Sequence, residues 1–209
     1  TSTPRTSGAS LLPVPTPSVH PAPPAYPAAA MSVTGSLVVK RTRRNAVLTY
    51  SREHYLRLDI PCPLSACPTC APLFAPSPSR AHFRLPSPPP AQCFIPDVPT
   101  ATAQVDLLTS REGPLDGAVV VLQTVLARVE GAKKKVFEKF RKAMVGEHAW
   151  VAMFNNENHR DTFVAARSGE GIAARDLRAV VVAAGWLAAH GRAEGCGKGV
   201  ELVVVTQEA

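Results

Sequence analysis

The chain has 209 residues, a formal net charge of +7, 21 prolines and five cysteines. An odd number of cysteines excludes a framework in which all of them form intramolecular disulfides, and because no secretory signal precedes them we expect a reducing compartment. No apolar run approaches the ~18 residues that a membrane helix needs, so we expect a soluble protein without a membrane partner.

The first third of the chain is rich in proline. Eight prolines lie in residues 1–30, which otherwise consist mainly of Ala, Ser and Thr and contain one arginine. Such a segment cannot bury enough apolar surface to offset its chain entropy, so we predict a disordered leader over residues 1–37. A transit peptide is the alternative, although one arginine is little basic charge for such a peptide. The leader could also be upstream sequence that is not native.

Three cysteines follow within the stretch "PCPLSACPTC", residues 61–70: Cys62, Cys67 and Cys70. A tetrahedral zinc site needs four ligands, so a distant histidine would have to complete the set. From the residues alone His54, His82 and His190 compete for that place. We expect the remaining cysteines to be a buried small residue, Cys93, and a loop thiol, Cys196. We assign residues 38–90 to a strand region that carries this motif and a proline-rich loop.

The second half of the chain, residues 91–209, alternates strand and helix patterns. We predict strands at 91–97, 117–123, 149–155 and 199–206, and a helix at 173–190. A further helix is predicted from Thr124, as its cap, through Lys142. This order indicates an α/β fold with a mostly parallel central sheet. In such sheets the working site lies at the carboxyl ends of the strands, where Asp97 and Glu208 fall.

The predicted helix that ends at Lys142 is amphipathic, with Val136, Phe137 and Phe140 between its basic residues. A basic helix face suits the phosphate backbone of RNA, while a solvated surface helix explains the same charges equally well. The candidate RNA-binding residues on this helix are Lys133, Lys134, Lys135, Lys139 and Lys142.

Three stretches carry a resemblance to a known family: "SREHYLRLDIPCPLSACPTC" (51–70), "VLQTVL" (121–126) and "FNNENHRDTFV" (154–164). They resemble the N-terminal region of the catalytic subunit of the eukaryotic RNA exosome, which is a three-cysteine motif followed by a PIN domain, an endoribonuclease fold. The resemblance implies a PIN-like three-layer fold, and partners that include exosome core subunits and single-stranded RNA. It also implies a location in the nucleus, the nucleolus and the cytoplasm.

The same resemblance implies the fourth ligand of the cysteine motif. In the family a histidine within a Trp-x3-His pattern completes the three cysteines, and this sequence has "GWLAAH", which ends at His190. Three thiolates and one imidazole form a closed, structural zinc site. Such a site would hold the proline-rich stretch against the α/β domain and support docking on the exosome core.

The nuclease positions of the family match less well. PIN domains hold two divalent metals with four acids. Those positions fall on Asp97, Arg128, Leu177 and Glu208, whose formal side-chain charges sum to minus one. Acids that are adjacent in the sequence could replace the missing ones. However, moving one residue along a helix changes the direction of the side chain by about 100°. We therefore expect Asp176 to point partly away from the site, and Glu130 almost opposite.

Two functions follow from this count. One is a PIN-like binding module whose metal-dependent nuclease site is impaired. The alternative is an active endoribonuclease with manganese or magnesium held by Asp97, Glu208 and a displaced acid such as Asp176. A third reading takes all these acids as helix caps and surface charges. Because the sequence lacks counterparts of the family's cold-shock, exonuclease and S1 domains, we expect no exonuclease activity and a C-terminal end that is truncated relative to the family.

Overall fold

The computed structural model describes residues 31–42, 45–64, 67–68, 70, 85, 91–110, 115, 117–145, 150–192 and 200–207. The predicted leader up to residue 30, most of the proline-rich loop, His82, Cys196 and Glu208 lie outside the described residues. Within the described part, no helix combines the length and the apolar character that crossing a membrane would require.

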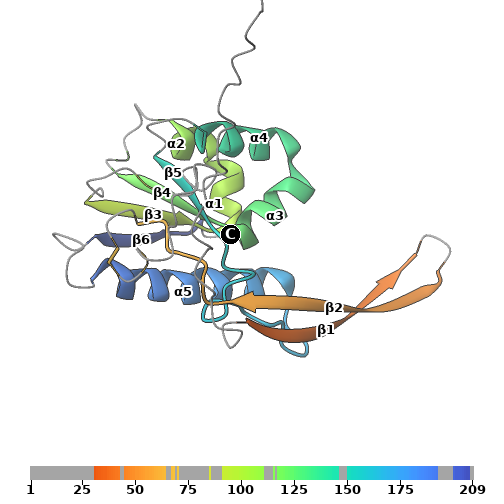
Figure 1. Cartoon of the computed structure of the whole chain (residues 1–209). Coiled ribbons are helices and arrows are strands. Elements are labelled where there is room, and N and C mark those ends of the chain that lie inside the picture. Colours follow the sequence, from red (N-terminus) through yellow and green to blue (C-terminus); the bar gives the residue numbers. More distant parts are fainter. Residues whose placement is uncertain are drawn as a thin grey trace, which may run out of the picture.

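A four-stranded parallel sheet forms the centre of the fold (Figure 1). Its strands are β3 (Gln92–Pro96), β4 (Ala118–Leu122), β5 (Val151–Phe154) and β6 (Glu201–Val205), and their spatial order is β5-β4-β3-β6. All three neighbouring pairs are parallel. Every residue of β4 is buried, as a β-branched run between two helical layers should be. The four predicted strands and their parallel arrangement are confirmed.

Helices cover both faces of this sheet and complete the three layers that were expected (Figure 1). One face carries α5 (Ile172–Gly191). The other carries α1 (Val98–Ala103), α2 (Val105–Thr109), α3 (Gln123–Ala132) and α4 (Lys134–Ala143). The sequence analysis did not predict α1 and α2, because each is too short to show a helical period.

The single helix predicted from Thr124 to Lys142 is wrong in two respects. It is interrupted at Lys133, whose φ of −143° and ψ of 82° are not helical. Gly131, a poor helix former, lies in the last turn before the interruption. Thr124 is not the cap either, since α3 begins one residue earlier and the Thr124 amide donates to the Asn156 side chain, 3.2 Å away. The cap therefore comes from a loop 32 residues further along the chain.

A long hairpin projects from the α/β body (Figure 1). Its strands are β1 (Met31–Arg41) and β2 (Val47–Arg57), paired from Met31 opposite Arg57 to Arg41 opposite Val47. The hairpin thus begins within the range 1–37 that the sequence analysis assigned to the leader. At its base, the Arg57 amide donates to the carbonyl of Asn158 at 2.8 Å. This contact ties the hairpin to the loop that follows β5.

Candidate metal centre and strand-end site

The three cysteines of the motif and the histidine of the Trp-x3-His pattern converge in space. One ligand atom from each of Cys62, Cys67, Cys70 and His190 lies within 4.8 Å of all the others. The Nδ1 atom of His190 is 3.4 Å from the Sγ atoms of both Cys67 and Cys70. His54, which competed in the sequence, instead lies against Phe163 with the two ring centroids 4.8 Å apart.

This donor set fits a tetrahedral zinc ion. Ideal Zn–S and Zn–N bonds place a sulfur and a nitrogen ligand about 3.6 Å apart and two sulfurs about 3.8 Å apart. The three thiols are buried, and the Cys62 amide donates to the Cys70 sulfur at 3.3 Å. The hydrogen bond between the Cys62 thiol and Cys70 lowers the pKa of Cys70 and raises that of Cys62, so the two sulfurs share one proton until a metal ion displaces it. Cys93, by contrast, is buried within β3, and burial raises its pKa to about 12.

Aromatic rings hold the histidine of the cluster in place. Trp186 lies one helical turn before His190 on α5, with their ring centroids 3.8 Å apart. Phe154 stacks on Trp186 at 5.1 Å, and the buried His159 packs against it at 4.4 Å. Burial lowers the pKa of His159 to about 4, so this ring is neutral near pH 7. The cluster therefore rests on side chains from β5, α5 and the loop between them.

Asp97 lies at the carboxyl end of β3, as predicted, and there it caps a helix. Its Oδ1 accepts a hydrogen bond of 2.8 Å from the amide of Thr100, in the first turn of α1. The Asp97 amide donates to the carbonyl of Val205 at the end of β6. The residue is buried, and so is the hydroxyl of Thr100, which finds no protein partner among the described residues.

Arg128 and Asp176 form an ion pair between α3 and α5. The Nε of Arg128 lies 2.6 Å from Oδ2 of Asp176, and a second guanidinium nitrogen lies 3.3 Å from Oδ1. Arg175 also approaches Oδ1, at 3.3 Å. The Arg128 side chain is 44% exposed and that of Asp176 only 5%.

The sequence analysis expected Asp176 to point partly away from the nuclease site, and the structure buries its side chain against Arg128 of α3. Asp176 continues the buried face of α5, which repeats at Ala179, Val180, Ala183 and Leu187, whereas Leu177 is 46% exposed. The helix is thus rotated so that the acid and not its neighbour faces α3. Glu130, the other displaced acid, is exposed on α3.

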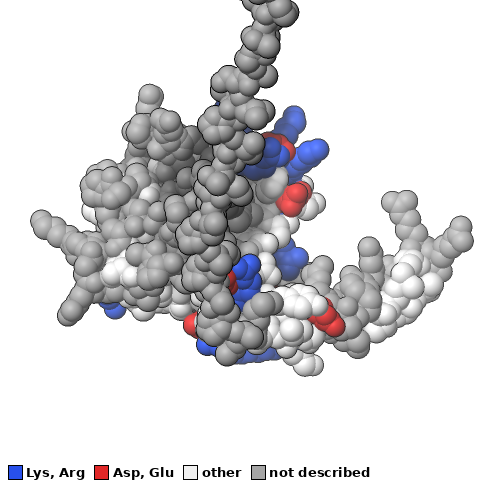
Figure 2. All heavy atoms as spheres, viewed as in Figure 1, with Lys and Arg blue, Asp and Glu red and all other residues white. Residues whose placement is uncertain are grey.

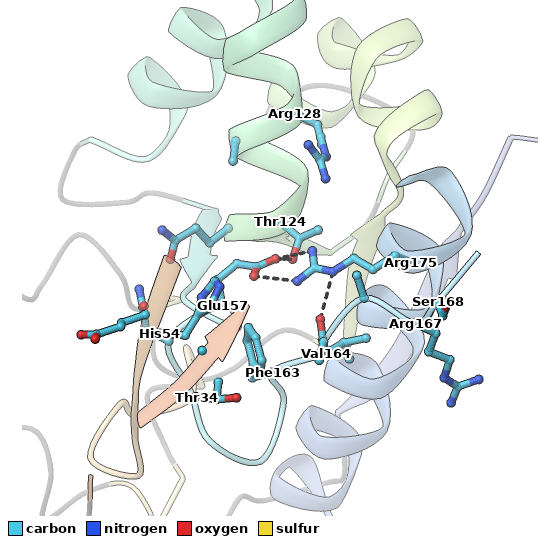
Figure 3. Close-up of a pocket in the computed structure, with 17 residues that line it drawn as sticks. Thr34, His54, Thr124, Arg128, Glu157, Phe163, Val164, Arg167, Ser168 and Arg175 are labelled. Carbon is cyan, nitrogen blue, oxygen red and sulfur yellow. Dashed lines mark hydrogen bonds and ion pairs between the residues drawn. The ribbon is translucent and has the colours of Figure 1, made fainter. Parts of the chain in front are cut away.

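Sequence reasoning missed Glu157, which lies at the centre of a second charged group (Figure 3). Its carboxylate accepts two hydrogen bonds from Arg175, at 2.6 and 2.7 Å, and one from the hydroxyl of Thr124. Burial acts to raise the pKa of Glu157, but the bonds from Arg175 and Thr124 outweigh it and hold the pKa below its usual value. Glu157 lies in the quoted "FNNENHRDTFV" stretch, so that motif was the available signal.

Comparisons with known proteins agree with this geometry. The human exosome complex exonuclease RRP44 is 32% identical over 176 residues, which cover 81% of this chain and 18% of the human protein. The exosome complex exonuclease dis3 of Schizosaccharomyces pombe is 29% identical over 180 residues, 82% of this chain and 18% of that protein. No protein-family model matches the sequence.

A solved structure shares the fold. The PIN domain of Trypanosoma brucei RRP44 superposes with a TM-score of 0.59 at 23% identity, covering 73% of this chain and 81% of that structure. This chain is homologous to the N-terminal, PIN-domain region of RRP44. It spans about a fifth of the length of the curated RRP44 relatives that it matches.

The described acids at the carboxyl end of the sheet are engaged by protein partners. In the part of the chain that the structure describes, the cysteine–histidine cluster is the one group of three or more potential metal ligands that converge. Asp97 is engaged as a helix cap, and Asp176 is bonded to Arg128 and Arg175. Glu208 lies outside the described residues.

The lysines that were proposed to meet RNA lie on the outer surface of the RRP44-like domain. Basic side chains gather over α4 (Figure 2), and the one fully buried residue of that helix is Phe140. Lys139 forms an exposed ion pair with Asp106 of α2. The exposed members of this surface are Lys133, Lys134, Lys135, Lys139 and Lys142.

Proposed function

We propose that this chain is a PIN-like module of an RRP44-type exosome subunit, acting in RNA processing and decay in the nucleus, the nucleolus and the cytoplasm. In this proposal its metal-dependent endoribonuclease site is impaired, and binding to exosome core subunits and single-stranded RNA is its main activity. The observation that carries the proposal is the ion pair between Arg128 and Asp176, at the place where an RRP44-type site would hold a metal.

The charge at this place argues against two divalent ions. A two-metal site needs several carboxylates with free oxygens to offset four positive charges. Both Asp176 oxygens already accept from guanidinium groups, and both Glu157 oxygens accept from Arg175. A fixed guanidinium also repels an incoming cation, whereas it suits a phosphate oxygen. These contacts favour binding over cleavage.

The cysteine–histidine cluster gives this module its second feature, a structural zinc ion held by Cys62, Cys67, Cys70 and His190. All four positions would be filled by protein ligands, so the ion would have no open position for catalysis. The site would join the segment after β2 to the last turn of α5. A surface fixed in this way is suited to docking on a partner such as the exosome core.

The alternative is an active endoribonuclease, and one observation favours it. The hydroxyl of Thr100 is buried without a hydrogen-bond partner among the described residues, one helical turn from Asp97, where it could support a metal-bound carboxylate. In that case Asp97, Glu208 and Asp176 would hold manganese or magnesium.

Cleavage of a circular single-stranded RNA decides between the two, because such a substrate has no ends for a contaminating exonuclease. We expect no manganese-dependent cleavage from the zinc-loaded wild-type protein. The matched variant is Asp97→Asn, which removes a metal-binding carboxylate while its side chain can still cap α1. Circular dichroism and thermal unfolding establish that both proteins are folded.

Cleavage by the wild-type protein that disappears in Asp97→Asn would overturn the proposal and establish the endoribonuclease. Cleavage that persists equally in both proteins would indicate a contaminating nuclease. Further purification should then give a wild-type protein without cleavage activity, as expected. Co-purification with exosome core subunits tests the docking part separately.

A further inference from the structure

A cavity of about 820 Å³ opens between the hairpin and the α/β body (Figure 3). Its walls come from the base of the hairpin, the first turns of α3, the loop after β5 and the first turn of α5. Arg128, Gln123, His54 and Phe163 are among the residues that line it. Its volume is within the range of pockets that hold small organic ligands.

In the ion pair between Arg128 and Asp176, the positively charged Arg128 side chain lines this cavity. The carboxylate of Asp176 is buried behind the pocket wall, whereas the Arg128 guanidinium is 44% exposed and lines the cavity. Arg128 uses Nε and one terminal nitrogen for Asp176, which leaves the other terminal nitrogen with its two N–H groups. A planar fork of this kind is suited to a phosphate oxygen.

An aromatic surface lies on the hairpin side of the same cavity. Phe163 and His54 face each other with ring centroids 4.8 Å apart, and Val164 and Ala165 continue the apolar wall. Rings of this kind can stack on the face of any nucleobase, and the interaction tolerates different sequences. The wall thus offers a place for a flat aromatic group.

Glu157, Glu53 and Gln123 also line the cavity. Glu157 is neutralised by Arg175, and Glu53 accepts a hydrogen bond from the Tyr55 hydroxyl. The Oε1 atom of Gln123 is buried and accepts no hydrogen bond from the described residues, although Gln123 lines the cavity. An amide in this position can hydrogen-bond the edge of a base.

We propose that this cavity is a nucleotide-binding pocket that works without a metal ion. The base would lie against Phe163 and His54, the amide of Gln123 would contact its edge, and the phosphate would bind Arg128. The inference extends the proposed function, because it places a ligand phosphate beside the residues that would otherwise hold a metal. The same chemistry is offered by a free nucleotide and by one unstacked nucleotide of an RNA chain.

Binding of adenosine 5′-monophosphate and of a short single-stranded oligoadenylate, measured by calorimetry in buffer without added divalent metal, tests the pocket. We expect both to bind the zinc-loaded protein, with Arg128→Gln and Phe163→Leu each weakening both affinities about tenfold. Arg141→Gln removes the same charge from α4, outside the pocket, and should change the affinity for the mononucleotide by less than about twofold. Tighter binding of the oligonucleotide than of the mononucleotide would identify an RNA chain as the ligand, and equal affinities a free nucleotide.

Each contrary result is decisive. Failure of both ligands to bind at millimolar concentration, or equal affinities in the wild type and in folded Phe163→Leu, would overturn the pocket. So would oligonucleotide binding that falls equally in Arg128→Gln and Arg141→Gln, since this indicates non-specific attraction to basic charge. Because the titrations contain no added manganese or magnesium, they are independent of the cleavage assay, and the pocket can stand even if the nuclease proves active.

Discussion

Replacing Cys67 by Ser is expected to abolish zinc binding and to lower the melting temperature by more than about 10 °C. Cys67 is fully buried, and its Sγ lies 3.4 Å from Nδ1 of His190, so loss of its thiolate removes one of four ligands. The cluster also belongs to the hydrophobic core, together with Leu64 and Leu85. Losing the ion would therefore loosen the contact between the cysteine motif and α5.

Cys93→Ala is the matched control, because it removes a buried thiol that is outside the cluster. Zinc content by elemental mass spectrometry should be about one ion per chain in the wild type and in Cys93→Ala, and none in Cys67→Ser. A strong chelator should lower the melting temperature of the first two proteins and leave the third unchanged. Equal melting of the wild type with and without the chelator would contradict a structural zinc.

The strands were predictable because each one carries its own signal. The run Val119, Val120, Val121 is buried on both faces of the sheet, and a continuous β-branched stretch is the pattern that such a strand requires. The convergence of Cys62, Cys67, Cys70 and His190 followed from the resemblance to the exosome subunit, since spacing alone left three histidines in competition. Both predictions rested on information contained in short segments.

The contacts at the carboxyl end of the sheet depend on distant segments, and the sequence did not reveal them. Thr124 looked like a helix cap, but Asn156 takes that role because the loop after β5 folds back onto α3. The inward rotation of Asp176 is set by the alanines and valines that α5 buries against the sheet. The sequence of a single helix indicates which of its residues share the buried face. It does not show which residue of another element contacts the polar residue on that face, here Asp176.

Two arginine–carboxylate pairs link separate elements at this end of the sheet. In a metal site the cations would screen acids that approach from different helices. Here Arg128 links α3 to α5 through Asp176, and Arg175 links α5 to the loop after β5 through Glu157. If the nuclease site is impaired as proposed, positive charge supplied by Arg128 and Arg175 would take over the electrostatic part of the metal's role.

This account predicts that Arg128→Glu converts a metal-independent site into one that responds to divalent ions. The variant places two carboxylates against each other and leaves the buried Asp176 with Arg175 alone, at 3.3 Å. We expect it to lose roughly 2 kcal/mol of unfolding free energy in buffer without added divalent metal, less than a fully buried pair would lose because Arg128 is half exposed. Millimolar manganese should restore part of this loss, whereas the wild type should melt at the same temperature with or without the metal.

Arg128→Gln separates the two effects, because it removes the positive charge without adding a ligand. We expect it to be destabilised without added divalent metal as well, but not to be rescued by manganese. Differential scanning calorimetry of the three proteins, with and without the metal, makes the comparison. If manganese raises the melting temperature of the wild type, and Asp176→Asn removes that increase, the carboxylate must already exchange Arg128 for a metal ion. The ion pair between Arg128 and Asp176 would then compete with metal binding. In that case the summed charge of the four family positions would not determine whether the site can cleave RNA.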